Sequence, residues 1–192
     1  MTHRQHPVRR GVSAGTLADE ALELLDSGHR LALAAAHDDH SELRVVYLFT
    51  RGADEARVEL TLPVPIADPR IPSLASISFP ASRFEREMHD LFGIVPDGHP
   101  LPRRLVRHGH WPRGWYPLRH DAGAPPEFGA ASQYPFLTVD GPGVFEIPVG
   151  PVHAGLIEPG LFRFSGVGET ILKLKARLWF VHRGIEGLFQ GR

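Results

Sequence analysis

The sequence predicts an α+β fold: a small antiparallel sheet with helices on one face, followed by a Pro/Gly-rich linker and a β-hairpin segment. Two amphipathic segments with helix-boundary residues flank three short β-rich segments that are joined by turns. The 20 glycines and 18 prolines concentrate after residue 93, and a second β-rich group follows residue 143. A hydrophobic content of 42% is enough for a packed core.

The first element follows a lead, residues 1–11, that we expect to be disordered. "TLADEALELLDSG" then predicts a helix with Thr16 as N-cap, Asp19 three residues later, and Gly28 just past its end. Its apolar positions share one helical face: Leu17, Ala21 and Leu24.

Three strands come next, and a second helix follows them. The strands are predicted at residues 29–37, 42–52 and 56–65, with loops of hairpin length between them. "SRFEREMHDLFG" predicts a helix opened by a Ser82–Glu85 capping box and ended by Gly93, with Phe84, Met88 and Leu91 as its apolar stripe. Its charges pair at i,i+4 spacing, as in a solvated helix, and such pairs contribute only about 0.2–0.5 kcal/mol each.

The second half of the chain divides into a linker and a β-rich segment. A composition shift near residue 122 predicts a first domain over residues 12–122, a linker over 123–143 and a second segment over 144–192. Within that segment "VFEIPVG" and "GLFRFSG" predict strands. "ILKLKARLWF" fits either a half-buried strand or a helical stripe, and the turn "GVGE" before it favours a hairpin, with a helix beginning near His182.

Composition excludes several classes of function. A net charge of −1 gives no footprint for nucleic acid, and the absence of cysteine excludes disulfides, thiolate nucleophiles and iron–sulfur ligands within this sequence. No signal peptide or membrane-spanning run is present, so we expect a soluble, intracellular chain. The histidines lack a third ligand at predictable spacing, and we expect no metal site among them: His37, His40, His108, His110 and His120.

One set of motifs has a more specific meaning. The string "ERE…DLFGI…GHP…RR", followed by "PLR" at 117–119, resembles the signature of the 30-kDa subunit family of respiratory complex I. That family includes the bacterial C subunits and their counterparts in membrane-bound [NiFe] hydrogenases, and the likeness covers residues 12–122, with His89 departing from the family's usual aromatic residue. The resemblance implies a structural domain that docks to other subunits through its signature residues, namely Glu85, Arg86, Glu87, Asp90, Gly93, His99, Pro100, Arg103 and Arg104. We therefore expect Arg86→Ala or Asp90→Ala to weaken assembly and to leave the melting temperature of the isolated domain nearly unchanged.

The last third carries a second resemblance. "GPVH" at 150–153, Gly168-Glu169 and "HRGIE" at 182–186 resemble the start of the large-subunit family that contains the 49-kDa subunit of complex I and group 4 [NiFe] hydrogenases of the formate hydrogenlyase type. This likeness implies a substrate or quinone region at His153, a signature role for Arg183 and a proton-transfer role for Glu186. From the residues alone, a Glu four positions after a His is more often a surface pair. The family's second histidine, expected just before Gly160, is missing, which favours the hydrogenase branch and weakens a quinone site at His153.

Together the two resemblances imply the N-terminal structural and assembly part of a [NiFe] hydrogenase or formate hydrogenlyase large subunit. The alternatives are an authentic C or C/D-type polypeptide of NADH-quinone oxidoreductase (complex I), and a truncated, non-catalytic interaction module. We expect no complete active site and no bound cofactor in this chain, with a nickel–iron centre or quinone and iron–sulfur clusters in the full complex. The expected partners are the large-subunit remainder, the iron–sulfur subunit and, indirectly, the membrane arm, at the cytoplasmic side of the membrane; no nucleic acid is expected.

Overall fold

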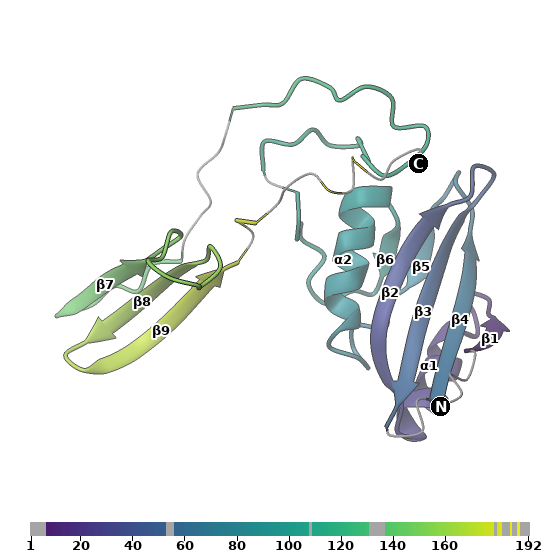
Figure 1. Cartoon of the computed structure of the whole chain (residues 1–192), viewed down its shortest axis with the longest axis horizontal. Helices are drawn as coiled ribbons and strands as arrows, with labels where there is room; N and C mark the ends of the chain where they lie inside the picture. The colour runs from purple at the N-terminus through teal and green to yellow at the C-terminus, as the bar shows by residue number, and fades with distance from the viewer. Residues whose placement is uncertain are drawn as a thin grey trace. The chain divides into compact units, whose positions relative to one another are not determined.

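The computed structural model describes residues 7–52, 56–107, 109–130, 137–178, 180–181, 185 and 188. The chain divides into two compact units with a boundary between Ser132 and Gln133 (Figure 1).

Unit 1 is built on a four-stranded sheet. The strands β2 (Arg30–Asp38), β3 (Leu43–Arg51) and β4 (Ala56–Val64) form an antiparallel meander, which confirms the three predicted strands. A further strand, β1 (Val8–Gly11), pairs in parallel with the free edge of β4. The expectation of a disordered lead is therefore wrong for residues 8–11. All four residues of β1 are exposed, so hydrophobic periodicity could not reveal a strand that is held by backbone pairing.

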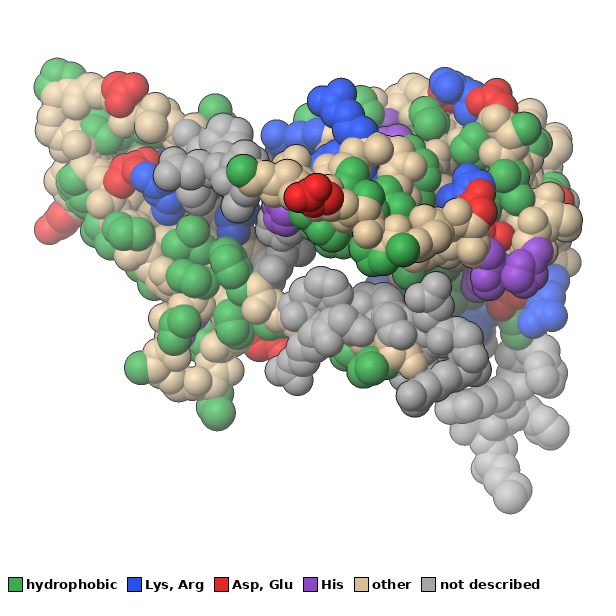
Figure 2. Space-filling model, turned by 90° about the horizontal axis from the view of Figure 1, so that it is seen from above, with side chains coloured by type: hydrophobic (Ala, Val, Ile, Leu, Met, Phe, Trp, Pro, Cys, Tyr) green, Lys and Arg blue, Asp and Glu red, His purple; other side chains and the backbone are tan. Residues whose placement is uncertain are grey.

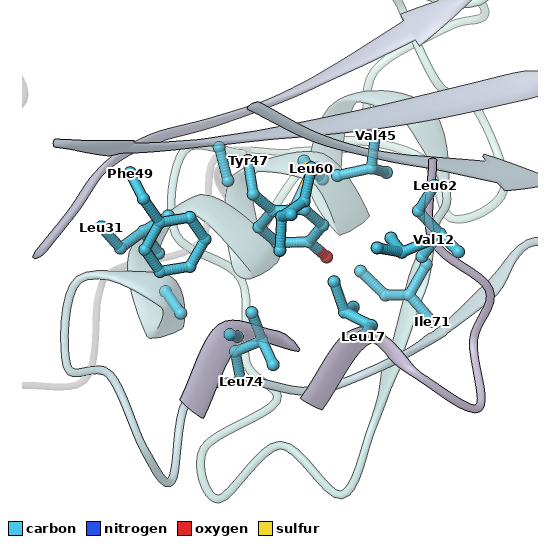
Figure 3. Close-up of a cluster of buried hydrophobic side chains, with 14 of the residues drawn as sticks. Val12, Leu17, Leu31, Val45, Tyr47, Phe49, Leu60, Leu62, Ile71 and Leu74 are labelled. Atoms are coloured by element: carbon cyan, nitrogen blue, oxygen red, sulfur yellow. The ribbon is translucent and has the colours of Figure 1, made fainter. Parts of the chain in front are cut away.

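One face of this sheet forms the core. Figure 3 shows side chains from β3 and β4 meeting those of α1 (Leu17–Asp26) and of the loop that precedes α2 (Ala81–Phe92). The core includes Tyr47, Phe49 and Leu60, each 0% exposed, together with the α1 stripe Leu17, Ala21 and Leu24. The packing confirms the predicted α+β class. Neither helix has a span long and apolar enough to cross a membrane, and the same holds for every helix within the described residues.

The ends of the helices differ partly from the sequence expectations. Thr16 precedes α1, but its hydroxyl accepts a hydrogen bond from the Ser13 amide at 3.1 Å and makes no side-chain cap. Helix α2 starts after Pro80, and the predicted Ser82–Glu85 capping box is absent because Glu85 bonds elsewhere. Gly93 ends α2 in the left-handed conformation, as expected.

A short parallel ribbon, which the sequence did not predict, connects the segments on either side of α2. It pairs β5 (Arg70–Pro72) with β6 (Val95–Asp97). The side chains of Arg70 and Asp97 form an ion pair across it. Each strand has three residues and contains a proline, so neither shows a strand periodicity that would predict it.

Unit 2 is a three-stranded antiparallel sheet. Its strands are β7 (Val144–Val149), β8 (Leu161–Val167) and β9 (Thr170–Arg177), in that order across the sheet. The predicted hairpin is confirmed as β8–β9, with Gly168 and Glu169 in its turn. Of the helix expected near His182, the structure describes only Ile185 and Leu188, and both are helical.

Candidate functional site: the polar side of helix α2

Most of the signature residues lie on α2 and on the segment that follows it. We call residues 99–118 the wrapping segment because its hydrogen bonds reach α2 from Ser82 in the first turn to Leu91 in the last. This segment and the loop that precedes α2 together cover the charged side of the helix: Glu85, Arg86 and Asp90 are only 0%, 7% and 2% exposed. The expectation of a solvated helix stabilised by i,i+4 pairs is therefore wrong for these three residues.

Glu85 ties α2 to the loop that precedes it. Its carboxylate accepts hydrogen bonds from the Ser73 hydroxyl at 2.5 Å and from the Leu74 amide at 2.6 Å. Burial raises the pKa of Glu85, and these two hydrogen bonds partly oppose that rise because they favour the charged form. Burial also raises the pKa of the nearby Tyr47 phenol, with the charge of Glu85 as a second cause.

His99 fixes the start of the wrapping segment on the first turn of α2. The Leu101 amide donates to Nδ1 of His99 at 2.9 Å, so the ring proton is assigned to Nε2, which donates to the Ser82 carbonyl at 3.1 Å. The same Nε2 lies 3.9 Å from the Glu85 carboxylate, and both side chains are fully buried. His99 is therefore a buried link between helix and loop.

Arg86 and Asp90 hold the middle of the wrapping segment through its backbone. The Arg86 guanidinium donates to the carbonyls of Arg103 and Arg104 at 2.7 and 2.8 Å. One carboxylate oxygen of Asp90 accepts hydrogen bonds from three consecutive amides, those of residues 105, 106 and 107, at 2.8, 2.9 and 3.1 Å. An anion that receives several backbone N–H groups satisfies donors that a buried loop would otherwise leave unpaired.

Arg107 secures the far end of the wrapping segment, a role that the sequence did not predict. Its guanidinium donates to the carbonyls of Asp90, Pro112 and Trp115 at 2.9, 2.9 and 2.5 Å. Burial is the main cause that lowers the pKa of Arg107. Because its partners are backbone carbonyls of a loop without periodicity, no spacing in the sequence could have identified it.

Gly93 allows the wrapping segment to pass close to the end of α2. It has a φ of +78°, and a Cβ at this position would lie 2.6 Å from the Tyr116 ring. The Leu118 amide donates to the Leu91 carbonyl at 3.2 Å beside it. A left-handed residue without a side chain is therefore required here for two independent reasons.

The geometry of this site is that of a clamp: buried charges of α2 bind the chain's own backbone. Because Arg86 and Asp90 form hydrogen bonds inside the domain, the structure argues against the expectation that their removal leaves the melting temperature of the isolated domain nearly unchanged, and we expect a loss of stability instead. Other signature residues, Glu87, Pro100 and Arg103, are exposed and remain candidates for contacts with partners.

A small hollow of about 90 Å³ lies beside the clamp. Its lining includes Arg86, His89 and Arg103, together with Val95, Pro96 and Pro102. These residues do not bring together an acid, a base and a nucleophile, so the hollow has no catalytic geometry of its own.

In unit 2 the predicted substrate-region residue, His153, binds its own loop. Its Nε2 lies 2.7 Å from the Gly160 carbonyl, and the Gly160 amide donates to the Pro151 carbonyl at 3.1 Å. These contacts close the base of the loop between β7 and β8. Apolar side chains within this loop are exposed to solvent: Leu156 is fully exposed and Val152 is 86% exposed. Arg183 and the proton-transfer candidate Glu186 lie outside the described residues.

The fold and the clamp define unit 1 as a compact α+β domain whose signature residues hold a long loop on a helix. The family described as "Respiratory-chain NADH dehydrogenase, 30 Kd subunit" matches residues 12–127, and the chain belongs to this family. The matched range contains every element of the clamp.

Relatives occur in two kinds of respiratory complex. The chain is 39% identical over 132 residues to hydrogenase-4 component G and 38% identical over 133 residues to formate hydrogenlyase subunit 5, both from Escherichia coli K12; each match covers 67% of this chain and 22% of the relative. It is 29% identical over 194 residues to the C/D subunit of NADH-quinone oxidoreductase from Bacteroides thetaiotaomicron, covering 88% of this chain and 36% of that protein. A match of that extent includes part of residues 144–192. The chain thus spans about a fifth to a third of the length of these relatives, and it is a complex I 30-kDa-type polypeptide related to oxidoreductase and hydrogenase subunits.

Proposed function

We propose that this chain is the N-terminal structural and assembly part of the large subunit of a membrane-associated [NiFe] hydrogenase or formate hydrogenlyase. The observation that carries the proposal is the likeness to the two Escherichia coli hydrogenase proteins, which extends over 132 and 133 residues, 67% of this chain. The C subunit of NADH-quinone oxidoreductase from Mycobacterium avium is similarly identical, at 40%, but over 99 residues, 50% of this chain. The loop sequence of unit 2 supports the same branch, because Glu158-Pro159 stands before Gly160 where the resemblance to the complex I branch implies a second histidine.

In this role the clamp supplies a preformed surface and no chemistry. The exposed signature residues Glu87, Pro100 and Arg103 would face the iron–sulfur subunit or the remainder of the large subunit, at the cytoplasmic side of the membrane. A nickel–iron centre and iron–sulfur clusters would be held by cysteines of other polypeptide sequence, since this sequence has none. Glu186 would take part in proton transfer once such a centre is beside it.

A second candidate is a C or C/D-type polypeptide of NADH-quinone oxidoreductase. The family description and the 88% coverage of this chain by the C/D relative favour it. In that case His153 would lie in a quinone region. The remainder of the large subunit, as a continuation of this chain or as a separate polypeptide, would lack Cys-x-x-Cys pairs.

Purification of the tagged chain from solubilised membranes of its source organism separates these candidates. We expect mass spectrometry to identify a companion or continuous polypeptide with two Cys-x-x-Cys pairs, and the preparation to evolve or consume hydrogen. Recovery with NADH-quinone oxidoreductase subunits and no hydrogenase activity would overturn the proposal in favour of the second candidate. Recovery as a free monomer would overturn both and leave a non-catalytic interaction module.

A further inference from the structure

The sheet of unit 2 has one face made entirely of apolar residues. Residues directly opposite each other on neighbouring strands share a face. Ile147 lies opposite Phe164, which in turn lies opposite Leu174, and the same pattern continues along the three strands. We call this surface the apolar sheet face; it comprises Phe145, Ile147, Val149, Phe162, Phe164, Leu174 and Ala176.

The two faces of this sheet differ in whether their side chains find partners. On the opposite face Glu146 pairs with Arg163, and Lys175 lies 3.9 Å from the same carboxylate. On the apolar sheet face, Ile147 is 48% exposed and Leu174 is 53% exposed. Hydrophobic side chains of unit 2 are visible at the surface in green at the left of Figure 2. An amphipathic sheet of this kind normally has a second layer over its apolar side.

The apolar sheet face also has a hollow that can receive a side chain from such a layer. Its volume is about 240 Å³. Its lining combines the apolar side chains of Phe145, Ile147, Phe164 and Ile171 with Gly166, Gly168, Glu169 and Thr170 around the β8–β9 turn. Gly166 leaves this space open, because a Cβ there would lie 3.2 Å from the Phe145 ring. An aliphatic or aromatic side chain from another layer is the chemistry that this lining fits.

The size of the face indicates what kind of partner covers it. Three strands of six to eight residues make a footprint of roughly 20 Å by 15 Å, from a rise of about 3.3 Å per residue and a strand spacing of about 4.8 Å. A freely diffusing second copy needs about 800 Å² on each side for a stable interface, so this face alone would hold it weakly. A polypeptide that is already held in the same complex can bind this face stably with a much smaller contact area, because its effective concentration at the face is high. The relatives extend well beyond the matched part and so contain sequence that could form this layer.

We propose that the apolar sheet face is the docking surface for the remainder of the large-subunit polypeptide, which covers it with an apolar layer and seats a hydrophobic side chain in the hollow beside Gly166. This inference rests on the proposed function and names the surface and the chemistry of its partner. The proposed contact is made by strands β7–β9 and does not involve the clamp residues of unit 1.

Single cysteines test the proposal cleanly, because the chain has none of its own. Ile147→Cys places a thiol on the apolar sheet face; Lys173→Cys, on the neighbouring register position of the opposite face, is the matched control. Maleimide labelling rates are measured for the isolated full chain and for the complex purified from source membranes. We expect labelling of Ile147→Cys to slow by about 10-fold or more in the complex, and that of Lys173→Cys to change by less than about 2-fold. Equal rates at Ile147→Cys in both samples would overturn the proposal, and Leu174→Cys repeats the measurement if the first variant does not assemble.

A benzophenone-maleimide on the same thiol identifies the partner by mass spectrometry. Cross-links to the large-subunit polypeptide support the proposal, whereas cross-links to a second copy or to residues 7–130 of the same chain overturn it. A cross-linked large subunit of the quinone-oxidoreductase type would overturn the proposed function and support the docking surface. If the complex is a hydrogenase but the thiol of Ile147→Cys is not protected in it, the proposed function would be supported and the docking surface would be overturned.

Discussion

The two units use side chains in opposite ways. In unit 1 charged residues of α2 are buried and bonded within the chain, with Glu85 at 0% and Asp90 at 2% exposure. In unit 2 apolar residues of a sheet are half exposed, as at Ile147 and Leu174. The charged residues of α2 therefore serve mainly to bind the chain's own backbone. The surface that lacks a covering layer is the apolar sheet face of unit 2.

The difference arises because each unit can pair buried polar groups within its own chain, but only unit 1 can also cover its own apolar surface. The wrapping segment contributes backbone amides and carbonyls, which need charged or polar partners when they are buried. Asp90, Arg86 and Arg107 provide such partners from within the chain. The buried Nε of Arg107 and Nδ1 of His89 have no hydrogen-bond partner among the described residues. The sheet of unit 2 satisfies its backbone and its charged face, but three strands cannot cover their own apolar side.

Removal of the Asp90 carboxylate is expected to have the largest effect on stability. Asp90→Ala leaves three consecutive amides of the wrapping segment without their acceptor, and we expect the free energy of unfolding of the isolated chain to fall by about 3 kcal/mol. Urea denaturation measures this change. The control is Glu87→Ala on the exposed side of α2, for which we expect a change within about 0.5 kcal/mol. Equal, small changes in both variants would restore α2 as a solvated interface helix.

A methyl group at Gly93 is expected to have the next largest effect. Gly93→Ala combines a positive φ with a contact to the Tyr116 ring, and we expect a loss of about 2 kcal/mol in the free energy of unfolding. Gly98→Ala is a matched control, because Gly98 has a φ of +77° with open space around it. We expect about 1 kcal/mol for the control. A control that costs as much as Gly93→Ala would show that the approach of Tyr116 does not matter.

The buried carboxyl of Glu85 is expected to make stability depend modestly on pH. Its pKa in the folded chain is raised above the ordinary value of 4.5, so the folded state holds this proton more tightly than the unfolded state does. The stabilisation is fully present below the unfolded-state pKa and is lost as pH rises through the folded-state pKa. Glu85→Gln should therefore flatten the decrease in unfolding free energy above pH 4.5. An unchanged pH profile in this variant, measured by urea denaturation at several pH values, would contradict the assignment.

The smallest effect on the isolated chain is expected on the apolar sheet face. Ile147→Ser removes a half-exposed side chain, and we expect the free energy of unfolding to change by no more than about 0.5 kcal/mol. Recovery of the assembled complex from membranes should nevertheless fall several-fold. A large loss of stability in the isolated chain would mean that Ile147 already packs within unit 2.

Local sequence patterns predicted the parts of the fold that depend on neighbours along the chain. The meander β2–β4, the hairpin β8–β9 and the Gly93 helix end follow from alternation, turn residues and the conformational freedom of glycine. Strands β1, β5 and β6 were missed because they are short and owe their existence to pairing with distant segments.

The candidate site was predicted in its residues but not in its physical role. The family signature selected Glu85, Arg86 and Asp90. Helical spacing could not show that the loop before α2 binds Glu85, or that residues 99–118 fold back over Arg86 and Asp90. Ser73 and Arg107 were missed altogether, because a hydroxyl in a loop and an arginine that bonds only carbonyls have no characteristic spacing. Burial of charge by a returning loop is a tertiary event, and only the structure displays it.

Amide hydrogen exchange of residues 105, 106 and 107 in the isolated full chain tests most directly whether the clamp forms without a partner. These three amides donate to Asp90 in the structure, so we expect them to exchange as slowly as the amides in the middle of α2, and to lose that protection in Asp90→Ala. Exchange at the rate of exposed loop amides in the unmodified chain would contradict a self-contained clamp, and would assign the order of the wrapping segment to assembly with other subunits.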